Sequence, residues 1–199
     1  MQKVSAKSKS QKKFFVIGNN LAIDFANTAT GVDGKETLKS WQDVADFLHA
    51  KKLSVGNLNS PKDKSAFVFA LKLRTLIRNI IESIVSKKPL KAKDFSALNQ
   101  YLSKASGFNQ FEKQPAGRWH LGWKYDFNLD DDPAVLFYPI IKSLPEFLES
   151  DNLDLVRKCA NCPLFFYDRS KTHLRQWCSM AVCGNRIKVA AFARRQSKF

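Results

Sequence analysis

The sequence predicts an α+β protein: a mainly helical N-terminal domain with a small antiparallel sheet, followed by a C-terminal four-cysteine zinc finger with a basic helix. Three observations support this fold class. Apolar residues recur at helical spacing in three segments between residues 40 and 106. The period changes to strict alternation in residues 118–127. All four cysteines of the 199-residue chain lie within residues 159–183.

The net charge of +15 is distributed unevenly along the chain. Residues 1–13 hold five Lys and no acid, residues 14–155 have a net charge of +1, and residues 156–199 have +9. Two basic ends on a nearly neutral body predict a nucleic-acid partner, DNA first and RNA as the alternative. No run approaches the ~18 apolar residues of a membrane span or resembles a signal peptide, so we expect a cytoplasmic protein without membrane contact.

These charges also suggest three parts: a disordered basic tail at 1–13, an N-terminal domain at 14–155 and the zinc finger at 156–199. The tail is rich in Lys, Ser and Gln and cannot bury enough apolar surface to offset the entropy of ordering. Whether it touches phosphates or is only a solubilising or cloning-derived end remains open.

The N-terminal domain opens with a predicted apolar strand at 14–17, a turn at Gly18 and Asn19, and a second apolar segment that carries Asp24 and Asn27. These two residues are candidates for a small-molecule or effector site. Buried caps or turn formers are the favoured interpretation, because Asp and Asn commonly play that role. No catalytic constellation occurs elsewhere, so the protein is predicted not to be an enzyme, with a site near Asp24 and Asn27 as the less favoured alternative.

Helical spacing and breaker residues predict the helices of this domain. Ser40 caps the first helix with Asp43 in its first turn, and Pro61 suits the first position of the second, which has the widest apolar face. Pro139 and Pro145 predict a kink or break in the last helix. The predicted helices are 40–53, 61–85, 91–106 and 133–150.

Residues 118–127 predict one strand of the sheet. Five apolar residues alternate there with polar ones, and Pro115 to Gly117 supply a turn from a preceding antiparallel strand. A base-stacking platform is the alternative to core packing for this aromatic row. The alternating residues are Trp119, Leu121, Trp123, Tyr125 and Phe127.

The cysteine spacing predicts one structural Zn²⁺. Two residues separate Cys159 from Cys162, four separate Cys178 from Cys183, and fifteen lie between the pairs. A short gap lets one tight turn present two sulfurs to a metal, and the intervening loop brings the second pair to the remaining tetrahedral positions.

Other roles for these cysteines fit less well. A redox CxxC motif would leave Cys178 and Cys183 unexplained, and disulfides are disfavoured in a reducing compartment. Simple burial of the four thiols remains an alternative. His173 could replace one cysteine as a ligand, although a surface or supporting role is favoured.

Residues 185–198 predict a helix with one apolar and one basic face. Val189, Ala190, Phe192 and Ala193 fall on the side expected to pack. Arg186 projects towards that side, so a structural role and a phosphate contact are equally favoured for it. The predicted nucleic-acid contacts are Arg169, Lys171, Arg175, Arg186, Lys188, Arg194, Arg195 and Lys198.

Two stretches carry a resemblance to a known family. WCSMAVCGNR (177–186), preceded by LFFYDRS, resembles the CGNR zinc finger, and GNNLAIDFANT (18–28) resembles the opening of an ABATE domain. The two-residue gap of the first cysteine pair is shorter than in many members. The resemblance implies a bacterial stress-induced transcription regulator that binds DNA through the finger, while the N-terminal domain senses an effector or mediates assembly, for example as a homodimer. An RNA-binding or ribosome-associated zinc protein is the alternative.

Overall fold

The computed structural model describes residues 14, 17–53, 63–104, 108–113, 119–124, 133–151 and 153–196. The predicted tail at 1–13 lies outside this part of the chain. The α+β class is confirmed: a helical body carries a two-stranded sheet, and a second small sheet belongs to the C-terminal region with the cysteines. No helix among the described residues is long and apolar enough to cross a membrane.

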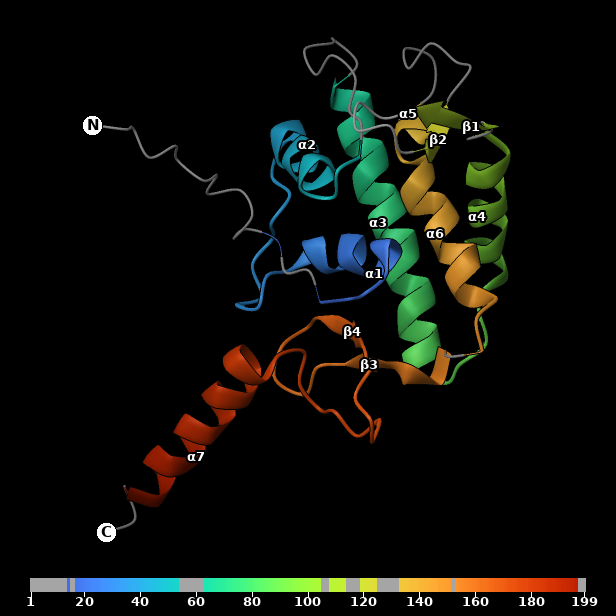
Figure 1. Cartoon of the computed structure of the whole chain (residues 1–199). Helices are drawn as coiled ribbons and strands as arrows, with labels where there is room; N and C mark the ends of the chain where they lie inside the picture. The colour runs from blue at the N-terminus through green and yellow to red at the C-terminus, as the bar shows by residue number, and fades with distance from the viewer. Residues whose placement is uncertain are drawn as a thin grey trace, which may run out of the picture.

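Helix α1 (Leu21–Ala26), continued by the 3-10 turn η2 (Asn27–Ala29), lies at the centre of the molecule (Figure 1). The Asn20 side chain caps α1 by accepting hydrogen bonds from the amides of Ala22 and Ile23, at 2.9 and 3.2 Å. Almost every residue of α1 is buried. The sequence predicted only an apolar segment here, because six residues are too few to show a helical period. Of the predicted strand at 14–17, residues 15 and 16 lie outside the described residues.

Three helices of the body follow the predicted pattern. Helix α2 (Trp41–Ala50) begins with the expected capping box, in which Ser40 and Asp43 bond each other's amides. Helix α3 (Asp63–Val85) is the central core helix, and α4 (Ala92–Lys104) lies alongside it. The fully buried positions of α3 are Ala70, Leu73, Ile77 and Ile81.

The last helix is broken, as predicted, but the break falls at Phe137 and neither Pro139 nor Pro145 interrupts the helix. Helix α5 (Pro133–Leu136) ends there and α6 (Tyr138–Leu148) begins. Pro139 therefore lies in the first turn of α6, where no helical amide bond is lost, so it starts a helix instead of interrupting one. Pro145 lies inside α6.

Both sheets are antiparallel pairs. Strands β1 (Phe108–Lys113) and β2 (Trp119–Lys124) pair with Phe108 opposite Lys124 and Lys113 opposite Trp119. This confirms the backbone of the predicted strand over 119–124; its remaining residues and its aromatic row lie outside what the structure describes. The 3-10 turn η3 (Leu153–Leu155) leads into β3 (Val156–Lys158), which pairs with β4 (Phe165–Tyr167).

The C-terminal region shares hydrophobic core with the helical body. Val156 and Phe165 of the small sheet belong to the main cluster formed by α1, α2, α3 and α6, and Val32 of the body belongs to a second cluster around the cysteines. Figure 1 shows β3 and β4 below α1 and beside the lower end of α3, whereas the last helix, α7 (Asn185–Gln196), projects away from the rest of the molecule.

Candidate metal centre and nucleic-acid interface

The first two cysteines lie in the turn that joins β3 to β4. The Cys159 amide donates to the Leu164 carbonyl at 2.9 Å, which continues the strand pairing and closes the turn around Cys162. Leu164 and Phe166 are fully buried beside the sulfurs. A short strand pair with an apolar inner face thus presents two thiols on the same side.

The second pair is positioned by a π-helical turn, η4 (Met180–Gly184), which contains Cys183 and follows Cys178. The Gly184 amide donates to the Ser179 carbonyl at 3.1 Å, the wide spacing of a π-turn. The Ala160 amide donates to the Gln176 carbonyl at 3.0 Å and ties the second pair to the first.

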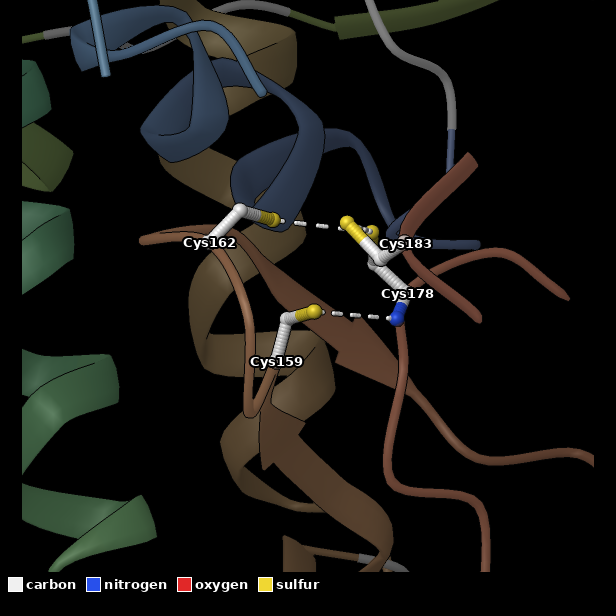
Figure 2. A group of neighbouring side chains, drawn as sticks. All are labelled: Cys159, Cys162, Cys178 and Cys183. Atoms are coloured by element: carbon white, nitrogen blue, oxygen red, sulfur yellow. Dashed lines mark hydrogen bonds between the residues drawn. The ribbon is translucent and has the colours of Figure 1, made fainter. Parts of the chain in front are cut away.

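The four cysteine sulfurs converge on one point and all lie within 4.8 Å of one another (Figure 2). The Cys162 sulfur lies 3.6 Å from that of Cys178, which lies 3.5 Å from that of Cys183. A tetrahedron with metal–sulfur bonds of about 2.3 Å has edges of about 3.8 Å. The separations are far longer than the ~2 Å of a disulfide, and all four cysteines are free thiols. The buried cluster can therefore hold one metal ion.

Without a bound cation, ionisation is unfavourable for the thiols of Cys162 and Cys178. Burial tends to raise the pKa of Cys159, but the amides of Cys178 and Asn161 donate to its sulfur and lower its pKa to about 7. Burial and the neighbouring thiols raise the pKa of Cys162 to about 12 and that of Cys178 further. A bound cation would stabilise all four thiolates, so metal binding would release protons.

His173 is not part of the metal cluster. Its Nδ1 lies 3.1 Å from the Asp168 carbonyl oxygen, and its side chain is exposed in the loop between the cysteine pairs. This agrees with the favoured supporting role over direct ligation.

Asp168 organises that loop, a role that sequence reasoning missed. Its fully buried carboxylate accepts hydrogen bonds from the amides of Ser170 and Arg175, at 3.0 and 2.9 Å. Burial tends to raise the pKa of Asp168, but hydrogen bonds from Ser170 and the Arg175 amide hold it below the ordinary value. The only available signal was that Asp168 is the single acid of residues 156–199.

Arg175, one of the predicted phosphate contacts, makes its contacts within the finger. Its guanidinium donates to the carbonyls of Trp177 and Cys178 and lies over the Phe166 ring at 5.0 Å. These contacts brace the chain immediately before the second cysteine pair. The guanidinium is bonded to two carbonyls of the turn and stacked on an aromatic ring, so its positive charge stabilises the turn.

The other predicted contacts are divided among the loop and the helix. Arg169 and Lys171 are exposed in the loop, and Arg169 lies over the Tyr167 ring at 5.5 Å. Lys188, Arg194 and Arg195 are exposed on α7, and Lys198 lies outside the described residues. The loop and α7 extend from the same cysteine cluster, so both groups of cations belong to one structural unit.

The apolar side of α7 does not pack against the protein, so that expectation was wrong. No residue of α7 is buried, and Val189 and Phe192 are 67% and 57% exposed. The buried cluster around the four sulfurs includes Leu164, Phe166 and Val32 but no residue of α7. The helix therefore presents all its sides to solvent, apart from the first turn.

Comparison with protein-family models shows that residues 19–151 match ABATE, described as "Putative stress-induced transcription regulator". The chain belongs to this family. Residues 156–196 match the CGNR zinc finger. Neither description is that of an enzyme. A search of curated proteins gave no match.

Within the ABATE region, Asp24 has structural partners for both carboxylate oxygens. Oδ1 accepts hydrogen bonds from the amides of Ile17 and Gly18, at 3.1 and 2.7 Å, and Oδ2 pairs with the Lys51 ammonium at the end of α2. A Cβ on Gly18 would lie 2.6 Å from Ile23 and 2.9 Å from Asp24 Oδ1. The loop can therefore approach the carboxylate only because Gly18 has no side chain.

Asn27 joins the ABATE region to the CGNR finger. Its amide nitrogen donates to the Phe165 carbonyl, and its oxygen accepts from the Phe165 amide, both at 2.8 Å. Asn27 thereby pairs with β4 as another strand would. The cavity that Asp24 and Asn27 line has a volume of about 10 Å³, enough for a single water molecule and too small for an effector.

Other contacts reinforce this junction, and their members were not identified from the sequence. Arg78 on α3 donates to the Ala26 carbonyl at 3.0 Å and lies over the Phe165 ring at 4.9 Å. Lys158 pairs with Glu82 at 2.9 Å. No sequence signal marked Arg78, since an arginine on an amphipathic helix ordinarily faces solvent.

Arg186 of the CGNR motif also reaches the ABATE region. Its guanidinium donates to the carbonyl of the buried residue Val32 at 3.5 Å. This favours the structural alternative for Arg186. The start of α7 is thus connected to the helical body, although the rest of the helix is not.

Proposed function

We propose that this ABATE-family protein is a zinc-dependent DNA-binding transcription regulator. The CGNR finger contacts the DNA, and the helical body senses an effector or mediates assembly. The functional division follows the three parts suggested by charge: a basic tail at 1–13, the body at 14–155 and the finger at 156–199. The partner chemistry and the metal are argued separately below.

Zinc is the metal that best suits the cysteine cluster. Four thiolates in a closed tetrahedral arrangement are the ligand set of structural zinc sites, and no position is left for a water or a substrate. The sulfur separations bracket the edge length of such a tetrahedron. The residues holding the metal are Cys159, Cys162, Cys178 and Cys183, and the ion would supply folding free energy rather than reaction chemistry.

The observation that carries the DNA proposal is the exposed positive charge of the finger. Residues 156–199 have a net charge of +9, against +1 for residues 14–155. The single acid of this segment, Asp168, is fully buried and turned towards its own loop. Phosphates would therefore be attracted to the finger and not to the body.

The shape of α7 also suits duplex DNA. An α-helix with its side chains is about 10–12 Å wide, and the major groove of B-DNA is about 12 Å wide. Because α7 projects from the body (Figure 1), neither α1 nor α3 would obstruct its entry into a groove. The exposed Phe192 could contact thymine methyl groups while Lys188, Arg194 and Arg195 contact phosphates.

The proposal can be tested by measuring duplex affinity of the zinc-loaded protein against salt concentration. Arg194→Ala with Arg195→Ala should weaken binding and lower the slope of log affinity against log salt by about 1 to 2, because each lost phosphate contact removes about 0.9. A matched pair on the body, Lys39→Ala with Lys64→Ala, should change neither quantity, although both lysines are also exposed.

Two outcomes would contradict this assignment. If both double variants lost the same amount of DNA affinity, the attraction to DNA would depend on the total charge of the protein and not on the finger. Preference for structured RNA over duplex DNA at the same salt concentration would favour the RNA-binding alternative. In that case the same arginines should still carry the salt dependence.

A further inference from the structure

A cavity of about 300 Å³, here called the junction cavity, lies where the helical body meets the finger. The body contributes the loop before α1 and the end of α6, and the finger contributes β4 and the loop that follows it. This volume is within the range of small-molecule sites, whereas the cavity beside Asp24 and Asn27 has room for only one water. The lining residues include Asn19, Asn20, Glu146, Phe147, Tyr167 and Arg169.

Hydrogen bonds and ring packing hold the walls of the junction cavity in place. The Asn20 side chain caps α1 and also donates to the Ser143 carbonyl of α6, at 3.3 Å. The Tyr167 ring of β4 packs edge-on against Phe147 of α6, with ring centroids 6.5 Å apart. The loop, α6 and β4 are thus fixed relative to one another, so a ligand would enter a preformed space.

Two side chains of opposite charge line the cavity and are both exposed, so a molecule in the cavity can reach them. Glu146 pairs with Lys142 one helical turn earlier, at 3.5 Å. The Arg169 guanidinium lies over the Tyr167 ring at 5.5 Å. Within the described part of the chain, Arg169 forms no ion pair with Glu146 or with any other acid. The N–H donors of Arg169 and a second oxygen of Glu146 are therefore available to a ligand.

Asn19 adds a polar group that can serve either charge. Its backbone is left-handed, with φ of 52°, a conformation in which asparagine is several-fold enriched. Its side chain is exposed and forms no hydrogen bond with the described residues. The amide can donate to a carboxylate through its nitrogen and accept from an ammonium through its oxygen.

The two charges disfavour ligands that carry only one sign. An anion attracted by Arg169 would be repelled by Glu146, and a cation attracted by Glu146 would be repelled by Arg169. A zwitterion satisfies both. Tyr167 and the largely buried Phe147 supply apolar surface beside the charged groups. An α-amino acid with an apolar side chain combines these three features in a molecule of suitable size.

We propose that the junction cavity binds an apolar α-amino acid whose carboxylate pairs with Arg169, whose ammonium pairs with Glu146 and whose side chain lies against Tyr167. Such a ligand bridges the two family regions, because Glu146 belongs to the ABATE region and Arg169 to the CGNR finger. Binding of the amino acid does not require that the finger bind DNA.

A further consequence concerns DNA, and it rests on the proposed function. Arg169 is one of the residues assigned to phosphate contact, so a bound carboxylate competes with a phosphate for its guanidinium. Saturating amino acid should therefore lower duplex affinity about two- to fivefold, the size of one exposed ion pair. In Arg169→Gln the amino acid should leave duplex affinity unaltered.

The site itself is tested without DNA. The full-length zinc-loaded protein is titrated with L-phenylalanine and L-leucine at neutral pH and low salt, and followed by ¹⁵N–¹H NMR. 3-Phenylpropionate and 2-phenylethylamine retain the ring and only one of the two charged groups. We expect saturable shifts at the end of α6, in the loop before α1 and in β4. Each single-charge analogue should bind about fivefold more weakly than L-phenylalanine, because it lacks one ion pair and meets one repulsive charge.

Two variants assign each charge of the ligand to its partner. Arg169→Gln should weaken L-phenylalanine and 3-phenylpropionate but not 2-phenylethylamine, and Glu146→Gln should weaken L-phenylalanine and 2-phenylethylamine but not 3-phenylpropionate. Lys171→Gln in the same loop and Glu149→Gln after α6 are the controls, since both residues are exposed and neither lines the cavity. The spectra also report whether each variant is folded.

Three results would each overturn the proposed site. The first is the absence of a saturable shift for both amino acids below about 10 mM, the weakest affinity expected for ligands of this size. The second is a set of shifts that maps away from the junction. The third is equal loss of affinity in the site variants and their controls. Lack of duplex binding would contradict the proposed function alone, because the amino-acid titrations contain no DNA.

Discussion

Asn27 and Phe165 exchange two 2.8 Å hydrogen bonds across the junction between the helical body and the CGNR finger, 138 residues apart in sequence. An asparagine amide has the donor and acceptor spacing of a peptide group, so it can pair with a strand edge that has no further strand. The Phe165 side chain meanwhile lies in the core of the body. The finger is therefore packed against the ABATE region and shares hydrogen bonds and hydrophobic core with it.

Asn27→Ala should destabilise the whole chain. The substitution leaves the buried amide and carbonyl of Phe165 without partners, at a cost of about 1–3 kcal/mol each. Melting temperature should fall by roughly 5–15 °C in a thermal scan followed by circular dichroism. Asn99→Ala, at an exposed position of α4, should change it little. Equal melting temperatures for the two variants would mean that the junction contributes no stability.

Zinc loss should destabilise the body as well as the finger. Val156 and Phe165 belong to the main core, so unfolding of the finger exposes apolar surface of α1 and α3. We expect one zinc per chain by elemental analysis, and a lower melting temperature after chelation that added zinc restores.

Cys178→Ser provides the matched test, because it removes the sulfur that lies within 3.6 Å of two others. This variant should have the low melting temperature from the start, and added zinc should not restore it. Purified protein that contains no zinc, or a body that melts identically with and without it, would contradict this prediction.

Asp24→Asn should lower stability through the lost pairing with Lys51. The ammonium of Lys51 is largely buried and would keep its charge without a counter-ion, which costs about 1–3 kcal/mol. Asp46→Asn, which affects only a surface contact with Gln42, is the control in the same thermal unfolding measurement. Unchanged stability together with loss of a cellular response would instead support the effector-site interpretation of Asp24.

Helix α7 should be only partly formed until it binds a partner. Isolated helices of about 12 residues are marginal in water, and most helix stability in proteins comes from packing, which α7 lacks beyond its first turn. Hydrogen exchange of residues 189–196 should be fast in the free protein and slower with duplex DNA. Strong protection without DNA, or exchange that DNA leaves unaltered, would show that α7 is not the element ordered by binding.

Local signals in the sequence determined most of the helices and the composition of the cysteine cluster. The capping residues Ser40 and Asp43 and the wide apolar stripe of α3 act within one or two helical turns, so they can be read without knowledge of the fold. The cysteine spacing is equally local, because a knuckle needs only a tight turn. The uneven distribution of charge along the chain can likewise be identified without knowledge of the fold.

Only the tertiary structure decided how the distant residues are used. Asn27, Arg78 and Arg186 have side chains that suit a surface, a ligand or a junction, and it is the position of β4 and Val32 that assigns them to the junction. The same applies to the exposed apolar side of α7: helical periodicity identifies an apolar face, but whether that face is covered depends on surfaces that other segments provide. Burial and pairing are relations between residues far apart in the chain, so no local pattern specifies them.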